Sequence, residues 1–129
     1  MGPYLTYAFF CEKFIIDRDD NCLSAIRIVT RVTTELPNTI NLGLVIGLVP
    51  GEMRGDATIT ISWTSPSGKP QRSFTFPFRL ADEDDTISEF AWAVRFPVSE
   101  VGVYWWELRL FEQLLTRLPM RVQLRTKDR

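Results

Sequence analysis

Short runs of alternating apolar and polar residues, separated by turn-forming residues, extend along this chain from residue 4 to residue 125. An alternation with a period of two is typical of a β-strand that buries one face. The clearest run covers 57–64, where alanine, isoleucine and tryptophan at every second position alternate with threonine and serine. No long segment has the i, i+3, i+4, i+7 apolar spacing of a capped helix. The chain is therefore predicted to be all-β.

About eight strands are expected, because turn signals rich in proline, glycine, aspartate and asparagine recur between the runs. The predicted strands cover residues 4–12, 22–34, 40–49, 57–64, 73–79, 90–96, 103–110 and 117–125. Pro77 and Pro119 fall inside two of them, and proline inside a strand favours the edge of a sheet. A closed barrel has no edges. The sequence therefore predicts a two-sheet antiparallel β-sandwich of the immunoglobulin-like type, with residues 1–129 as a single domain.

The length and net charge of the chain limit the number of domains and the kinds of partner that we expect. Its 129 residues are enough for one domain with its own hydrophobic core. The formal net charge is -1, so no global positive field draws the protein to nucleic acid or to an anionic membrane. No apolar run is long enough to cross a bilayer as a helix. We therefore expect no nucleic-acid partner and no membrane partner.

The first residues of the chain and its cysteines indicate the cellular compartment in which the protein is expected. Residues 1–10 lack the positive n-region and the long apolar run of a signal peptide, which favours a cytoplasmic location. The only cysteines are Cys11 and Cys22. Thiols stay reduced in the cytoplasm, so we expect two free thiols at strand ends.

The chain contains no histidine. A Ser-His-Asp triad and a Cys-His pair are therefore excluded, as are zinc sites built on histidine. The commonest general base near neutral pH is also missing. We expect no catalytic residue, no cofactor and no enzymatic activity.

Acidic residues are concentrated in loops that alternating strand direction assigns to one end of the sandwich. These loops are 17–21, 50–55, 82–85 and 112–113. Clustered loop carboxylates are the ligands that Ca²⁺ prefers. The candidate metal ligands are Asp17, Asp19, Asp20, Asp82, Asp84 and Asp85. If they converge, they bind calcium or support metal-dependent hydrolysis; otherwise the loops bind a basic partner or keep an apolar β protein in solution.

A second candidate surface consists of small and apolar residues that alternate outward on three predicted strands. Its residues are Gly43, Val45, Gly47, Val49, Ala91, Ala93, Val103 and Trp105. Small residues on a sheet face let another layer approach closely, and a monomer rarely exposes a large apolar patch. If the strands 40–49, 90–96 and 103–110 are neighbours, this patch is an interface for a second copy or for a protein partner. The alternative is that another segment of the chain covers the strand 40–49.

Aromatic and arginine residues leave two further alternatives open. A carbohydrate-binding platform needs outward aromatic rings, but the alternation places most of these rings in the core, and only Trp105 faces outward. Arg117, Arg121 and Arg125 share one face of the last predicted strand, where they could hold phosphate. Arginines along an edge strand also protect it against aggregation, which accounts for them without a ligand.

Three short motifs resemble a known family. The segment 8–12 reads Ala-Phe-Phe-Cys-Glu, and after an acidic turn the hydrophobic run 23–32 begins with Leu-Ser. The segment 102–108 has the pattern Gly-x-Tyr-x-x-x-Leu. Over roughly half of the chain these motifs resemble a bacterial family of small uncharacterised β domains, although Arg31 stands where that pattern has an acidic residue. The resemblance implies a cytosolic β-sandwich of unknown function and supplies no catalytic residue.

The sequence thus predicts a non-catalytic binding or assembly module that acts through protein–protein contacts, with a protein partner or as a homo-oligomer through a sheet face. The alternatives are a β-sandwich that binds calcium or carbohydrate, and a carboxylate- or metal-dependent hydrolase. Convergence of the loop carboxylates around an ion distinguishes the metal-dependent alternatives. A large buried interface distinguishes assembly.

Overall fold

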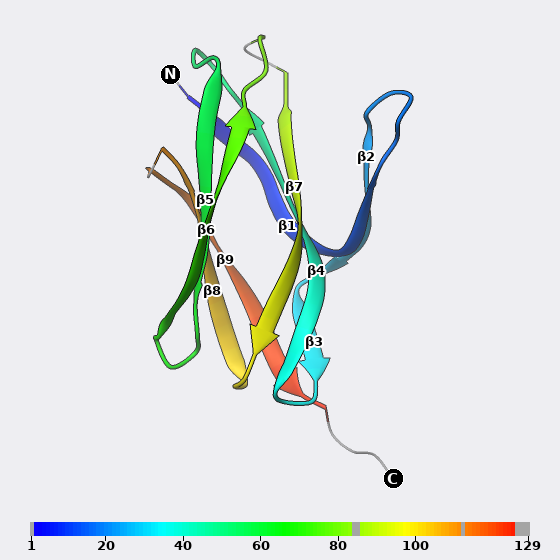
Figure 1. Ribbon diagram of the computed structural model, residues 1–129, viewed down its shortest axis with the longest axis vertical. Helices are drawn as coiled ribbons and strands as arrows, with labels where there is room; N and C mark the ends of the chain where they lie inside the picture. Colours follow the sequence, from blue (N-terminus) through cyan, green and yellow to red (C-terminus); the bar gives the residue numbers. More distant parts are fainter. Residues whose placement is uncertain (1, 84–85, 112, 126–129) are drawn as a thin grey trace.

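The computed structural model describes residues 2–83, 86–111 and 113–125, which form strands and no helix. The strands are β1 (Tyr4–Ile16), β2 (Leu23–Val29), β3 (Arg31–Thr34), β4 (Asn38–Val49), β5 (Asp56–Thr64), β6 (Pro70–Arg79), β7 (Ser88–Val98), β8 (Gly102–Leu110) and β9 (Gln113–Leu124). They build two facing sheets (Figure 1), which confirms the predicted all-β sandwich. This described part holds no helix long and apolar enough to cross a membrane.

The two sheets divide the strands unequally. Sheet A has the order β2-β1-β4-β7, and sheet B has the order β3-β9-β8-β5-β6. Paired strands are antiparallel, except that β3 and β9 are parallel. β4 and β7 lie in sheet A, whereas β8 lies in sheet B. The consecutive strands β7 and β8 therefore belong to different sheets.

The hydrophobic core lies between the inner faces of the sheets. Alternate residues of the central strands point inward and are fully buried, among them Leu44, Ile46, Leu48, Ile59, Ile61 and Leu108. Trp63 stacks on Trp106 with ring centroids 4.2 Å apart, and Phe96 packs edge-on against both rings. Stacked and edge-on pairs are the preferred geometries of aromatic side chains. The alternation over 57–64 therefore separates a buried face from an outer face, as predicted.

The predicted strand 22–34 consists of two strands. β2 pairs with β1 in sheet A, whereas β3 pairs with β9 in sheet B. Thr30 lies between them and belongs to neither. A strand that crosses from one sheet to the other at a corner keeps its alternation on both sides. The sequence pattern therefore contains no signal of the crossing.

The two strand prolines have different surroundings. Pro77 lies in β6, an edge strand of sheet B, as predicted. Pro119 lies in β9, between β3 and β8, so the prediction that this strand is an edge is wrong for residues 121–124, which pair with β3. Pro119 precedes that stretch and pairs only with β8 among the described residues. Because β3 is short, the part of β9 that contains Pro119 has no paired strand on that side in the part of the chain that the structure describes, and proline is tolerated there.

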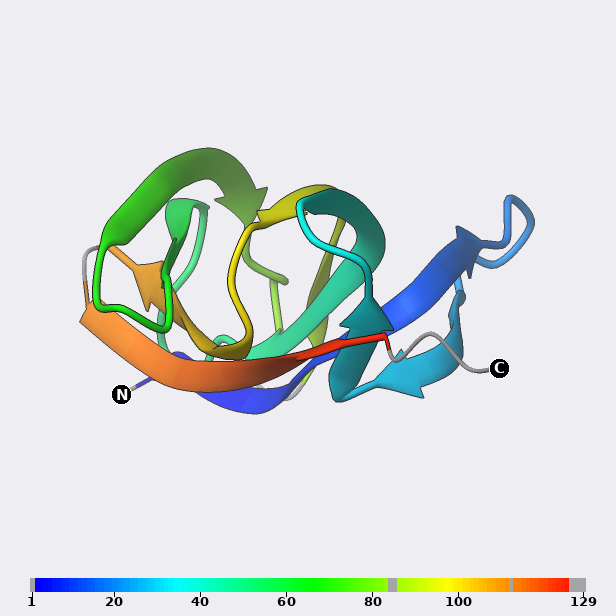
Figure 2. The same ribbon diagram turned by 90° about the horizontal axis from the view of Figure 1, so that it is seen from below.

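The hairpin formed by β1 and β2 extends beyond the sandwich. β1 pairs with β4 only as far as Cys11, and the rest of β1 pairs with β2 alone. Figures 1 and 2 show this hairpin projecting sideways from the two layers. We call residues 12–28 the arm. At its base Arg27 has a left-handed φ of 61° and forms an ion pair of 3.5 Å with Glu12.

Candidate interaction surface

Aromatic side chains of β1 cover the outer face of β4. Val45 on that face is fully buried. A Cβ atom at Gly47 would collide with the ring of Tyr7. A Cβ atom at Gly43 would lie 2.8 Å from the ring of Phe14. Glycine at these two positions therefore provides the space that the two rings occupy.

The Tyr7 side chain links three strands of sheet A. Its hydroxyl group reaches from β1 across Gly47 on β4 and donates a hydrogen bond of 2.5 Å to Glu89 Oε2 on β7. Burial raises the pKa of Tyr7 to about 12, and the hydrogen bond and negative charge of Glu89 add to the effect. The phenol is therefore held in its protonated, donating form.

The structure corrects the predicted interface patch. β8 belongs to sheet B, so Val103 and Trp105 lie on a different face from the patch residues of β4 and β7. Gly43, Val45 and Gly47 are buried, Val49 and Ala91 are half-buried, and Ala93 is exposed. The alternative in which another segment of the chain covers the strand 40–49 is the one observed, because β1 supplies the cover. The patch fails as one surface because parity does not reveal which sheet a strand joins.

The arm carries the apolar surface that the sequence did not reveal. Ile15, Ile16 and Ile28 are 52%, 53% and 62% exposed. Single exposed apolar residues are common on protein surfaces, but here three lie on one projecting hairpin, with Ile15 and Ile16 on opposite faces of it. The predicted first strand ended at residue 12. The available signal was the apolar run 14–16, which continues up to the acidic turn.

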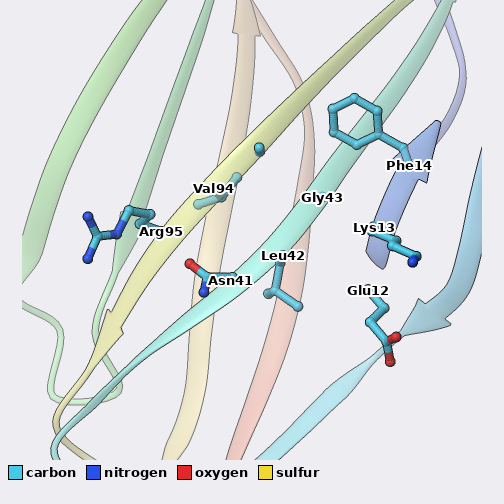
Figure 3. Close-up of a pocket in the computed structure, with 9 residues that line it drawn as sticks. Glu12, Lys13, Phe14, Asn41, Leu42, Gly43, Val94 and Arg95 are labelled. Atoms are coloured by element: carbon cyan, nitrogen blue, oxygen red, sulfur yellow. The ribbon is translucent and has the colours of Figure 1, made fainter. Parts of the chain in front are cut away.

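A shallow pocket lies where the arm meets the outer face of sheet A. Its volume is about 330 Å³, and Phe14, Gly43 and Ala93 form its apolar part. Figure 3 shows Phe14 on one side of this pocket and Arg95 on the other, with Gly43 between them. Lys13 and Arg95 are exposed at its rim. Glu12 is exposed there too and forms an ion pair with Arg27. The arm pocket, as we call it, is therefore apolar inside, with two cations and a carboxylate at its rim.

The acidic turn at the tip of the arm is stabilised by its own carboxylates. Asp17 Oδ1 accepts the backbone N–H of Asp19 at 2.8 Å, and Asp20 Oδ1 accepts the backbone N–H of Cys22 at 3.0 Å. Such bonds are typical of aspartate in turns. These carboxylates therefore shape the turn, as well as giving it negative charge.

The predicted metal ligands are not brought together among the described residues. Figure 1 shows the turn of the arm apart from the connection between β6 and β7, which contains Asp82. Asp84 and Asp85 lie outside the described residues. Within 2–83, 86–111 and 113–125, no three acidic or cysteine side chains are arranged so that they could hold a metal ion. The convergence on which the calcium alternative depends is therefore not seen in the part of the chain that the structure describes.

Neither cysteine is placed as an activated nucleophile. Both are free, Cys11 buried and Cys22 exposed. Burial raises the pKa of the Cys11 thiol, which a hydrogen bond from the backbone of Ile26 partly offsets. The nearby charge of Asp20 raises the pKa of the Cys22 thiol. A reactive cysteine needs the opposite shift, because the thiolate is the nucleophile.

The outer face of sheet B carries Trp105 with paired charges around it. Trp105 faces outward, as predicted, and is 38% exposed. The Arg117 guanidinium lies 4.6 Å from the centroid of its ring. Glu107 pairs with Arg109 at 2.5 Å and with Arg117 at 3.6 Å. The exposed ring and these two arginines therefore already have partners within the chain.

Comparison with known proteins identifies the fold of this chain. No family model matches the sequence, and no curated protein matches it. An immunoglobulin-like protein from Pseudomonas aeruginosa is similar with a TM-score of 0.53 and 14% sequence identity, over 95% of this chain and 98% of that one. The chain therefore has an immunoglobulin-like fold.

Two larger proteins contain a similar region. The alkylpurine DNA glycosylase AlkC from Pseudomonas fluorescens matches with a TM-score of 0.45 and 8% identity, over 90% of this chain and 30% of that one. A β-glucosidase from Listeria innocua matches with a TM-score of 0.46 and 7% identity, over 97% of this chain and 17% of that one. The chain spans less than a third of either protein, and these likenesses carry no conclusion about activity.

Proposed function

We propose that the protein is a non-catalytic binding or assembly module that acts through protein–protein contacts, and that the arm is its main contact surface. The observation that carries this proposal is the exposure of Ile15, Ile16 and Ile28 on a hairpin that projects from the sandwich. Burying one isoleucine side chain completely is worth about 1.5–3 kcal/mol. Three half-exposed isoleucines thus offer a partner a sizeable apolar contact.

The chemistry of the side chains supports a role without catalysis. The sequence has no histidine, and the pKa values of both thiols are raised. A histidine-free domain lacks the usual general base, and a thiol with a raised pKa is a poor nucleophile. Free thiols suit a reducing compartment, so the proposal places the module in the cytoplasm. It also places the chain in the bacterial family of small β domains that its motifs resemble.

The proposal is tested by removing the apolar surface of the arm. We expect the double variant Ile15→Ser/Ile28→Ser to lose associations that the wild type makes, with itself in sedimentation velocity or with other proteins in crosslinking inside producing cells. The control is Ile87→Ser, since Ile87 is another exposed isoleucine, at 42%, and lies outside the arm. Equal association by both variants, or a wild type without any protein contact, contradicts the proposal.

A further inference from the structure

We propose that the occupant of the arm pocket is the arm of a second copy of this chain, in a two-fold symmetric dimer in which each arm docks on the other protomer. This inference rests on the proposed function and names the partner. Docking surface and docking element occur on the same chain. A two-fold contact uses one patch twice, with each half of the patch meeting the other half.

The apolar parts of the two elements match. The arm offers Ile15 on one face and Ile16 on the other, each about half exposed. The arm pocket offers the ring of Phe14 and the small residues Gly43 and Ala93, so that little side-chain bulk fills its floor. The arm's own isoleucines remain in solvent although this pocket adjoins them, so the chain does not bury them by itself. A second arm would cover both surfaces at once.

The charged parts of the two elements have opposite signs. The tip of the arm carries Asp17, Asp19 and Asp20 against a single Arg18. The rim of the pocket carries Lys13 and Arg95 against Glu12, whose carboxylate is already paired with Arg27. Across the described residues, neither of these two cations has a carboxylate within ion-pair distance. An acidic arm tip that approaches a basic rim is electrostatically complementary, which favours this orientation over others.

A second copy fits these charges better than an unrelated partner does. In the symmetric dimer the acidic tip of each protomer meets the basic rim of the other, so the interface contains this pairing of opposite charges twice. The formal net charge of -1 means that two copies approach each other without strong long-range repulsion. The opposing charges therefore act locally, and the dimer should weaken as salt rises because exposed pairs are screened.

The experiment is a charge swap, measured as the dissociation constant of the dimer by sedimentation velocity at low salt. Asp19 is the residue of choice on the arm, because its carboxylate makes none of the hydrogen bonds that hold the turn. We expect Asp19→Arg and Arg95→Glu each to raise the dissociation constant of the homodimer about tenfold or more. A mixture of the two variants should form a heterodimer of nearly wild-type affinity, because it contains one native and one reversed charge pair. The control Arg72→Glu, on the edge strand β6, should change nothing.

Three outcomes overturn the inference. These are a wild type that stays monomeric at every concentration, a dimer unaffected by either reversal, and a mixture that does not associate. The failure of this inference can be told from the failure of the proposed function. If the chain is monomeric but Ile15→Ser/Ile28→Ser abolishes binding to another protein, the arm is an interaction surface and only its occupant is wrong. If that variant also leaves all binding intact, both proposals fall.

Discussion

The outer faces of the two sheets differ in how far their residues are exposed to solvent. On sheet A, β4 presents glycine and valine outward, and rings from β1 cover them until Val45 is fully buried. On sheet B, β5 presents threonine and serine outward, and these residues stay exposed or half-exposed. A strand with apolar residues on both faces needs a cover on both faces. Sheet A finds its cover within the chain over β4, but β1 continues into an arm that the chain does not cover.

We therefore expect substitutions on the outer face of β4 in sheet A to cost stability, and substitutions on the outer face of β5 in sheet B to cost little. The largest effect is expected for Gly47→Val, because its side chain occupies the place of the Tyr7 ring. We expect the free energy of unfolding to fall by about 3 kcal/mol in urea titrations, as overpacking predicts. Thr58→Val, on the outer face of β5, is the matched control and should change stability by no more than about 0.5 kcal/mol.

A double-variant cycle separates this cause from general weakening of the strand. In a Tyr7→Ala background the ring is absent, so Gly47→Val should cost far less than in the wild type. Equal costs in both backgrounds would mean that the ring is not what requires glycine.

The next effect concerns the second ring on this face. Phe14→Ala removes the ring that lies over Gly43 beside the buried thiol of Cys11. Because Phe14 is half-buried, we expect a loss of about 2 kcal/mol, roughly half the cost at a fully buried site. A thiol reagent should then modify Cys11 as well as the exposed Cys22, whereas the folded wild type reacts quickly at Cys22 alone. Continued protection of Cys11 in the variant would show that other groups cover it.

A smaller effect is expected for Tyr7→Phe, which keeps the ring and removes the hydrogen bond to Glu89. The loss should be about 1 kcal/mol near neutral pH. The pKa of Tyr7 is about 12 in the folded protein, whereas an unfolded tyrosine titrates near about 10. The contribution is therefore fully present below pH 10 or so and is lost as the pH rises towards about 12. Unfolding titrations across this interval should show the wild type losing more stability than Tyr7→Phe; parallel losses would contradict the raised pKa.

Much of the sandwich could be predicted from the sequence, for physical reasons visible at single positions. The alternation over 57–64 and the proline at position 77 reflect burial and hydrogen bonding within one strand, which local sequence records. The break at Thr30, the separation of β8 from β4 and β7, and the partly covered edge at Pro119 depend on which strands become neighbours. The same alternation is compatible with several ways of pairing the strands, so the sequence pattern does not predict these features.

The candidate site was harder to predict than the fold. The small residues of β4 were correctly interpreted as space for another layer, but that layer turned out to be the Tyr7 and Phe14 side chains of the same chain. The arm was not expected because the predicted first strand ended at residue 12 and left Phe14, Ile15 and Ile16 outside any strand. Only the paired length of β1 beyond Cys11 shows that this segment leaves the sandwich.

The smallest effect on stability is expected at the exposed isoleucines of the arm. Ile15→Ser/Ile28→Ser should leave the free energy of unfolding within about 1 kcal/mol of the wild type, because both side chains are more than half exposed. Urea titration checks this directly. A loss as large as that of Phe14→Ala would mean that these two isoleucines stabilise the fold, as Phe14 does, and are not held in reserve for a partner.

The most direct test of the arm as a protein-interaction surface is hydroxyl-radical footprinting of the wild type across a series of concentrations and in the producing cells. The account predicts that side chains of the arm, residues 12–28, lose reactivity as complexes form, while Trp105 on sheet B keeps its reactivity. An arm that stays as reactive in every complex as in the dilute monomer, with protection appearing at Trp105 instead, would contradict it.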